Sequence, residues 1–329
     1  LLSRQFDRDR DRVLQRAHAD GHCMGMLVWF SDIEKQSSIS DICKTNSGYC
    51  YYATGIHPDN IDRTNKKSHD EWLEKVEEMG KKAECLALLS GLNLSREVGT
   101  HFSQESLLTS SLQLTKKLQL PLILHLADGK SVERSIEMLY GESSGKDDDD
   151  LSGFTASMII HDVITCTGAE PNFKTLLVEH AQSPTHPLYF IVSGAGITDP
   201  DDVIRSKARE FLHDLPNESL LVATDSPWRT PQNLLDAYLR TLRNEPSNIE
   251  SIVQAMAETK GVDLPTMARI LKENTLRVFG MESIRLHAAM PAVQEGNDEE
   301  EDEEEEEVED HPKATAKHVE EVSKGMKDL

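Results

Sequence analysis

The segment LLVATDSPW, residues 220–228, is an apolar run that ends on the carboxylate of Asp225 and stops at Pro227. A short continuous apolar run is typical of a strand buried on both faces of a parallel sheet. Proline has no N–H to donate to a ladder, so it ends such a strand. Parallel α/β proteins gather their functional groups at the carboxyl ends of the strands. Asp225 is therefore a candidate functional residue, and the other strand ends have to supply its partners.

Apolar runs alternate with amphipathic segments along most of the chain. The predicted strands lie near 24–30, 50–55, 84–90, 121–125, 157–161, 187–193 and 219–225, and further helical patterns follow at 231–243, 248–259 and 263–273. This alternation indicates an α/β fold with a parallel sheet. A (β/α)8 TIM barrel needs eight strands. Because the chain opens directly on a helical pattern, we expect the first barrel strand to lie before Leu1; an open doubly wound sheet is the alternative.

Charge is concentrated at the end of the chain. The 329 residues carry a net charge of −23, and residues 290–329 contribute −12 of it. The ten consecutive acidic residues at 298–307 repel one another and cannot build a core. We therefore predict a barrel over 1–283 and an acidic disordered tail over 284–329, for which a basic partner is one candidate ligand. The acidic balance without a basic stripe argues against broad electrostatic binding to nucleic acid.

Cysteine usage and hydropathy limit the cellular compartments in which the protein is expected. The five cysteines, Cys23, Cys43, Cys50, Cys85 and Cys166, are odd in number and show no CxxC spacing. This argues against a disulfide framework and a zinc finger, and it favours reduced thiols in the cytoplasm or nucleus. We expect no membrane association, because no apolar run reaches about 18 residues and no basic-plus-apolar leader is present.

Four polar residues stand at the carboxyl ends of four predicted strands: His57, His125, His161 and Asp225. In a parallel sheet these ends lie on one face, whatever their separation in sequence. Histidine nitrogen and aspartate oxygen bind divalent metals, and a bound metal supplies hydroxide at neutral pH. A single histidine after a strand is more often a capping or hydrogen-bonding residue. Four such residues at four strand ends favour a shared metal-assisted site.

The order of these motifs resembles the TatD family of metal-dependent deoxyribonucleases, which are amidohydrolase-like (β/α)8 barrels. The similar segments are YYATGIHPDN (51–60), ECLALLSGLNLS (84–95), LQLPLILHLAD (118–128), MIIHDVITCTG (158–168), LLVATDSPW (220–228) and KENTLRVFG (272–280). They correspond to the family's GxHP, GEIGLDY, PxxLHxR, IIHxFxG and LLxETDSPY segments and to its closing helix. The resemblance runs from about residue 8 to 280.

This resemblance implies a set of roles for the strand-end residues. His125, His161 and Asp225 are the implied metal ligands, Asp225 is the implied catalytic residue that orients or deprotonates water, and His57 is an implied substrate-binding residue. The implied cofactor is a divalent metal, Mg²⁺, Mn²⁺ or Zn²⁺. The implied substrate is DNA or another phosphodiester.

The departures from the family pattern weaken these expectations. The family's bridging glutamate aligns with Leu89, which cannot bind a metal. The arginine of LHxR aligns with Ala127, the glutamate of ETDSP with Ala223, and the aspartate of GLDY with Asn93. The HxH pair of the family's first strand has no counterpart in the chain. We therefore expect one weakly bound ion or none.

Three functions remain open from the sequence. The first is a TatD-like metal-dependent hydrolase, a deoxyribonuclease or phosphodiesterase whose activity is reduced or lost. The second is a catalytically dead barrel that acts as a binding or scaffold protein. The third is a single-metal amidohydrolase that acts on a small molecule. The fold does not decide between them, because function depends on the site.

Overall fold

The computed structural model describes residues 1–29, 35–63, 66–140, 157–184 and 187–281. All of them belong to one compact unit, Leu1–Pro291. The predicted disordered tail over 284–329 lies outside the described residues, so the predicted boundary between barrel and tail stays a prediction.

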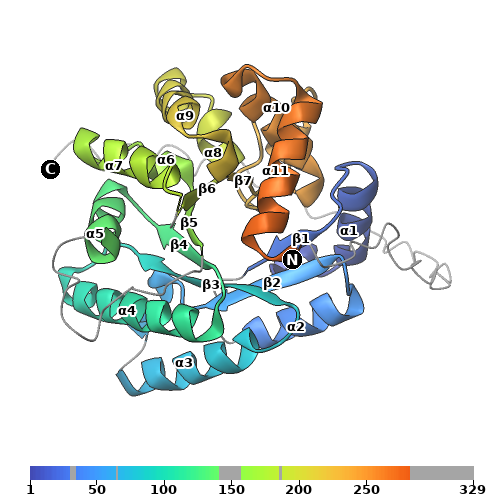
Figure 1. Ribbon diagram of the computed structural model, residues 1–329. Coiled ribbons are helices and arrows are strands. Elements are labelled where there is room, and N and C mark those ends of the chain that lie inside the picture. Colours follow the sequence, from blue (N-terminus) through green and yellow to red (C-terminus); the bar gives the residue numbers. More distant parts are fainter. Residues whose placement is uncertain (30–34, 64–65, 141–156, 185–186, 282–329) are drawn as a thin grey trace, which may run out of the picture. The chain divides into compact units, whose positions relative to one another are not determined.

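Seven parallel strands form one sheet in the order β1-β2-β3-β4-β5-β6-β7. Their bounds are β1 Met26–Val28, β2 Cys50–Gly55, β3 Cys85–Leu92, β4 Leu122–Leu126, β5 Met158–His161, β6 Leu188–Val192 and β7 Leu220–Val222. The strand order follows the chain without a reversal, as in a barrel and unlike a doubly wound sheet. The sheet curls, and the helices lie outside it (Figure 1). β1 and β7 stand at its two ends, and no described strand pairs with their outer edges.

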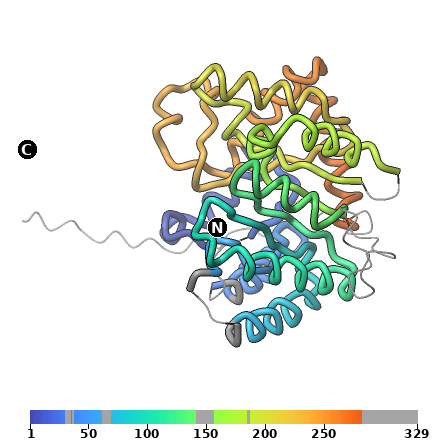
Figure 2. The backbone as a smooth tube through the Cα atoms, turned by 90° about the vertical axis from the view of Figure 1, so that its left-hand side faces the viewer, coloured from blue at the N-terminus to red at the C-terminus, as the bar shows by residue number. Residues whose placement is uncertain are grey.

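The helices connect successive strands. The α-helices are α1 Arg10–Ala19, α2 Gln36–Thr45, α3 Lys66–Gly80, α4 His101–Leu118, α5 Gly129–Tyr140, α6 Val163–Cys166, α7 Pro171–Ala181, α8 Gly194–Ile197, α9 Asp202–Asp214, α10 Ile249–Lys260 and α11 Leu264–Val278. The 3-10 helices are η1 Arg4–Phe6, η3 Pro58–Arg63, η4 Val98–Thr100, η6 Asn217–Ser219, η7 Leu239–Thr241 and η8 Pro246–Asn248. Neighbouring helices such as α3 and α4 lie side by side (Figures 1 and 2). No described helix is long and apolar enough to cross a membrane.

Capping residues set the bounds of the long helices near the end of the fold. Asp201 accepts hydrogen bonds from two backbone N–H groups in the first turn of α9, and Asp263 does the same for one in α11. Side-chain oxygens at this position satisfy N–H groups that have no partner within the helix. Gly261 adopts the left-handed conformation that ends α10, with φ of 66°. The end of α10 and the beginning of α11 therefore lie where their capping residues place them.

The predicted helix over 231–243 is wrong. This segment forms turns and only the short η7, and Figure 2 shows it as an irregular loop coloured between yellow and orange. The apolar residues that suggest a helical period, such as Leu235 and Tyr238, are exposed by 101% and 67%. A helix is stabilised mainly by packing its apolar face. Here Leu234 is the only buried leucine, and the other leucines and Tyr238 remain exposed. The buried side chain of Asn244 fixes the loop instead, by donating to the carbonyls of Thr224 and Trp228.

The sheet separates an inner apolar cluster from the larger of two outer ones. The inner cluster contains Leu89, Ile123, Ile159, Ile191 and Leu221 on the concave face. The outer cluster lies between the sheet and the helices and contains the neighbouring strand residues, which point the other way. Side chains alternate along a strand, so a residue two positions beyond the inner layer also points inward. The carboxyl ends of β4 and β5 therefore project His125 and His161 above an apolar floor.

Candidate active site

Three histidines gather at the carboxyl ends of the strands. His125 on β4 is the register partner of His161 on β5. The ring centroids of His125 and His161 lie 5.4 Å apart, and those of His57 and His125 lie 4.2 Å apart. Nε2 of His161 lies 2.7 Å from Oδ1 of Asp225, which follows β7. The structure therefore brings all four predicted site residues into one cluster.

His161 and Asp225 form a buried ion pair. Burial acts to lower the pKa of His161, but the charge of Asp225 and its hydrogen bond outweigh burial, so this pKa is raised. Burial likewise acts to raise the pKa of Asp225, but His161 and Arg229 lower it to about 2. An opposite charge at hydrogen-bond distance favours the charged form of each partner. The pairing therefore favours an imidazolium beside a carboxylate.

His57 and His125 are neutral because burial prevails over the nearby charges. Burial lowers the pKa of His57 to about 4, although the charge of Asp59 opposes this shift. Burial and the two neighbouring histidines hold the pKa of His125 well below its usual value. Nδ1 of His57 accepts a hydrogen bond from the backbone N–H of Asp59, at 3.2 Å. Neutral imidazoles are the form that can accept a proton or bind a metal.

Asp162 and Arg229 join the site, and the sequence analysis missed both. Asp162 is 1% exposed, accepts a hydrogen bond from the hydroxyl of Ser193, and has its pKa raised by burial. Nη1 of Arg229 lies 3.7 Å from Oδ2 of Asp162 and 3.6 Å from Oδ2 of Asp225. The Arg229 side chain is 44% exposed, so it faces both the two carboxylates and solvent.

A turn after β7 places Arg229 over the strand ends. The backbone N–H of Trp228 donates to the carbonyl of Asp225 at 2.9 Å, and Asp225 and Arg229 both have left-handed φ, 57° and 56°. Non-glycine residues seldom adopt this region, and propensity gives little sign of it. The one available signal for Asp162 was its position directly after His161 at the end of a strand.

The position of the family's bridging glutamate is filled by hydrocarbon. Leu89 is 1% exposed and packs in the inner cluster beneath the histidines. Ala127 is exposed, and Ala223 packs at the edge of the same cluster. At these three positions the chain therefore has no side chain that binds a cation or a phosphate.

The donor types suit a metal, but their arrangement does not form a cage. Nδ1 of His125 and Nδ1 of His161 are buried without a hydrogen-bond partner. Nδ1 of a neutral His125 could donate a lone pair, whereas His161 would first have to lose the proton that its pairing with Asp225 favours. Within the described ranges, however, no group of three His, Cys, Asp or Glu side chains is placed to hold a metal ion. His161 and Asp225 bond to each other instead. A cation at this site would compete with that hydrogen bond and with the charge of Arg229.

Comparison with known proteins identifies relatives over nearly the whole described fold. The family described as TatD related DNase matches residues 1–280. The 3'-5' ssDNA/RNA exonuclease TatD of Pectobacterium atrosepticum is 26% identical over 283 residues, which covers 85% of this chain and 96% of that protein. The protein of the same name from a Rahnella species is 27% identical over 294 residues, which covers 87% and 97%.

Solved structures share the fold. A TatD homolog from Escherichia coli K12 superposes with a TM-score of 0.63 at 22% identity, over 84% of this chain and 94% of that one. A hydrolase of the TatD family from Entamoeba histolytica gives a TM-score of 0.61 at 18% identity, over 82% and 89%. The curled parallel sheet, its strand order and the family match over residues 1–280 agree, and the chain therefore belongs to the TatD related DNase family and has its (β/α)8 TIM-barrel fold.

Proposed function

We propose that this chain is a metal-dependent phosphodiester hydrolase whose nuclease activity is reduced relative to its TatD relatives. The observation that carries the proposal is Leu89, an apolar side chain 1% exposed beneath an otherwise polar site. The relatives' names, which specify single-stranded DNA and RNA exonucleases, support a single-stranded nucleic acid as substrate. The cytoplasm or nucleus remains the predicted location.

In this proposal the residues at the strand ends have different roles. His125, His161 and Asp225 would hold one divalent ion, Mg²⁺, Mn²⁺ or Zn²⁺, which supplies Lewis acidity and a hydroxide at neutral pH. Asp225 would orient the attacking water and take its proton, because it lies beside the histidines, whereas the carboxylate of Asp162 is bonded by Ser193. His57, which is 7% exposed and neutral, contacts the substrate.

Arg229 supplies the phosphate contact that Ala127 does not. Its guanidinium is half exposed and is held at the site by Asp162 and Asp225. A guanidinium can donate two parallel hydrogen bonds to phosphate oxygens. Asp162, fixed by Ser193, keeps the guanidinium over the strand ends. In this proposal the chain binds the substrate phosphate through an arginine on the loop after β7.

The expected reduction in activity follows from electrostatics. Two-metal phosphodiesterases hold their ions about 3.5 to 4 Å apart, and a bridging carboxylate offsets the repulsion between them. Leu89 offers no such charge, and Arg229 adds a positive one. A second ion is therefore disfavoured, and one ion alone stabilises less of the charge that develops on the phosphate.

A binding or scaffold protein is the second candidate function. It is favoured by Leu89, Ala127 and Ala223, which replace charged residues of the family pattern at three positions. The hydrogen bond between His161 and Asp225 also favours it, because that bond occupies two of the three proposed ligands.

Metal content and cleavage of a single-stranded oligonucleotide distinguish these functions. The chain, Leu89→Glu and Asp225→Asn are assayed in Mg²⁺, Mn²⁺ and Zn²⁺, with Leu89→Gln as the uncharged control of similar size. We expect the unmodified chain to cleave slowly, to bind at most one ion, and to lose its cleavage activity on Asp225→Asn. Of the two Leu89 variants, only Leu89→Glu should raise the metal content and the cleavage rate. Two bound ions with rapid cleavage in the unmodified chain would contradict the proposal. No cleavage in any variant would favour the binding protein.

A further inference from the structure

Exposed aromatic side chains lie on the same face of the barrel as the candidate active site. Among the described residues, the exposed aromatic side chains are Phe102, Trp228 and Tyr238, at 82%, 63% and 67%. Phe102 lies in the first turn of α4, after β3, and the other two lie in the loop after β7. Both segments leave the carboxyl end of a strand, which is where a parallel barrel binds its ligands. Three flat apolar surfaces therefore lie where a substrate would approach the site.

Trp228 is the exposed ring that directly precedes Arg229 of the site. Its backbone N–H donates to the carbonyl of Asp225 at 2.9 Å, and its own carbonyl accepts from the side chain of Asn244 at 2.8 Å. The buried Asn244 side chain also donates to the carbonyls of Thr224 and Arg229. The backbone of this turn is thus held at several points while the indole remains in solvent. A fixed backbone beneath an exposed ring is preorganised for binding, because little freedom is lost when a ligand arrives.

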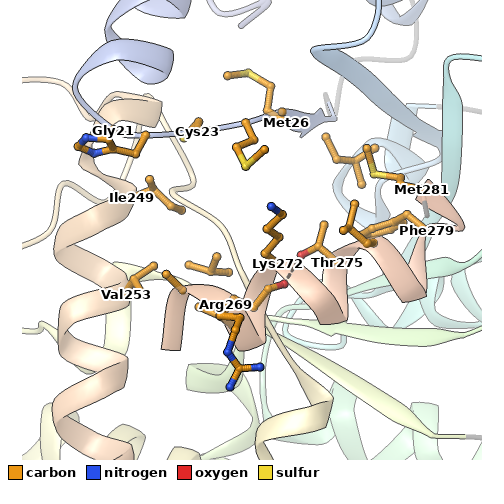
Figure 3. A pocket seen from close by; sticks show the side chains of 18 of the residues that line it. Gly21, Cys23, Met26, Ile249, Val253, Arg269, Lys272, Thr275, Phe279 and Met281 are labelled. Atoms are coloured by element: carbon orange, nitrogen blue, oxygen red, sulfur yellow. Dashed lines mark hydrogen bonds between the residues drawn. The ribbon is translucent and has the colours of Figure 1, made fainter. Parts of the chain in front are cut away.

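The loop after β7 does not cover a cavity of its own. A cavity of about 570 Å³ opens between β1, β7, α10 and α11, and Figure 3 shows Met26 on one side of it and Ile249 and Val253 on another. None of the described residues from 223 to 248 lines this cavity. The exposure of Trp228 is therefore not that of a lid over an apolar pocket, and its position beside Arg229 is the feature to explain.

We propose that Trp228 and Arg229 together bind one nucleotide of a single-stranded nucleic acid, with a base stacked on the indole and a phosphate on the guanidinium. The inference rests on the proposed function, since it places part of that substrate. Consecutive Cα atoms lie about 3.8 Å apart, so the two side chains can reach neighbouring groups of one nucleotide. An aromatic ring stacks on any base, and a guanidinium binds phosphate oxygens.

The charges around Trp228 favour this ligand. The chain has a net charge of −23, and the carboxylates of Asp162 and Asp225 lie beside Arg229, so phosphate contacts alone give weak binding. A stacked base is neutral and adds affinity that does not depend on released counterions. An apolar protein partner is disfavoured, because it would bury the 44% exposed side chain of Arg229. Stacking on Trp228 thus supplies the affinity that the acidic surface does not.

Binding of a fluorescent single strand to the full chain tests this inference. A strand of about 12 thymidines is titrated in EDTA, so that cleavage does not contribute, and is compared with an abasic strand of the same length. The abasic strand keeps the phosphates and lacks the bases. We expect Trp228→Ala to weaken binding of the thymidine strand by about 5- to 100-fold. The abasic strand should bind the unmodified chain and this variant equally.

Matched variants separate stacking from the loss of apolar bulk. Trp228→Phe keeps a flat ring and should bind within about threefold of the unmodified chain, whereas Trp228→Leu should behave like Trp228→Ala. Leu235→Ala removes a more exposed side chain from the same loop and should leave binding unchanged. Arg229→Leu should reduce the dependence of affinity on salt concentration, and Trp228→Ala should leave that dependence as it is.

Three results would overturn the proposal. One is no binding of the thymidine strand at about 1 mM by the folded chain. Another is a loss on Trp228→Ala that is equal for the thymidine and abasic strands, or absent for both, because the indole would then not contact a base. The third is self-association of the chain that Trp228→Ala abolishes, which would make a second copy the occupant of this surface.

A parallel cleavage assay distinguishes this inference from the proposed hydrolase function. A chain that binds the strand through Trp228 and cleaves nothing would contradict only the hydrolase function. A chain that cleaves the strand with a KM that Trp228→Ala does not change would contradict only the stacking contact.

Discussion

Replacing Arg229 by leucine should strengthen divalent cation binding at the strand ends. Nη1 of Arg229 lies 3.6 Å from Oδ2 of Asp225, and a cation held by this carboxylate lies about 2.0 to 2.3 Å from its oxygen. The two positive groups would thus be at most about 6 Å apart. Removing the guanidinium removes this repulsion, while the three proposed ligands remain.

The magnitude follows from Coulomb's law with allowance for solvent. A divalent ion and a unit charge about 6 Å apart repel by about 1.4 kcal/mol in bulk water and about 2.8 kcal/mol at half that dielectric constant. Arg229 is 44% exposed, so the effective value belongs near the aqueous end of this range. We therefore expect the affinity for Mn²⁺ or Zn²⁺ to rise about tenfold.

Isothermal titration of the metal-free chain at constant pH and ionic strength measures this change. Arg229→Lys is the charge-conserving variant and should keep the low affinity. Arg269→Leu on α11 removes a charge of the same sign that pairs with Glu273 rather than with a site residue, and it controls for net charge. An unchanged or weaker affinity of Arg229→Leu, in a chain that remains folded, would refute the argument that this guanidinium opposes cation binding.

Three further predictions test the fold that supports the site. Gly91→Ala should disrupt the β3–β4 edge and lower soluble expression, because an added Cβ would lie 1.9 Å from the carbonyl oxygen of His125. Phe190→Ala, at a position that is 0% exposed, should lower the free energy of unfolding by about 3 to 5 kcal/mol, as measured by urea denaturation. The Asp9–Arg243 ion pair lowers the pKa of Asp9 in the folded chain. The pair therefore stabilises the fold fully at pH values above the ordinary pKa of an aspartate, and this stabilisation is lost as the pH falls through the lowered pKa of Asp9. Arg243→Met should therefore reduce the difference in melting temperature between pH 6 and pH 3.

The parts of the fold that sequence could predict depend on local patterns. Each strand is a short apolar run bounded by polar or turn-forming residues, so all seven could be located, and the register of β4 and β5 then brings His125 beside His161. The loop over 231–243 shows the limit of such patterns. Its apolar period matches a helix, but only tertiary packing decides whether that face is buried.

The parts of the site that sequence could not predict depend on tertiary contacts between residues far apart in the chain. Arg229 reaches Asp162 and Asp225 because the chain turns back after β7 through two left-handed residues. Nothing in a run of apolar and polar residues marks that turn. Asp162 was equally hidden, since only the structure shows that Ser193 binds it beneath the guanidinium.

The sequence and the structure indicate two different roles for Leu89. In the sequence it is a lost metal ligand. In the structure it also completes an apolar layer with Ile123 and Ile159, both 0% exposed. A leucine buried here stabilises the fold by about 1.5 to 3 kcal/mol relative to exposure, whereas an unpaired buried carboxylate costs free energy. A glutamate at this position is compatible with the fold only when a cation balances its charge. In the proposed absence of a second cation, the packing of the barrel floor favours leucine, so the proposed reduction in metal binding and the continuous apolar floor would both follow from one residue.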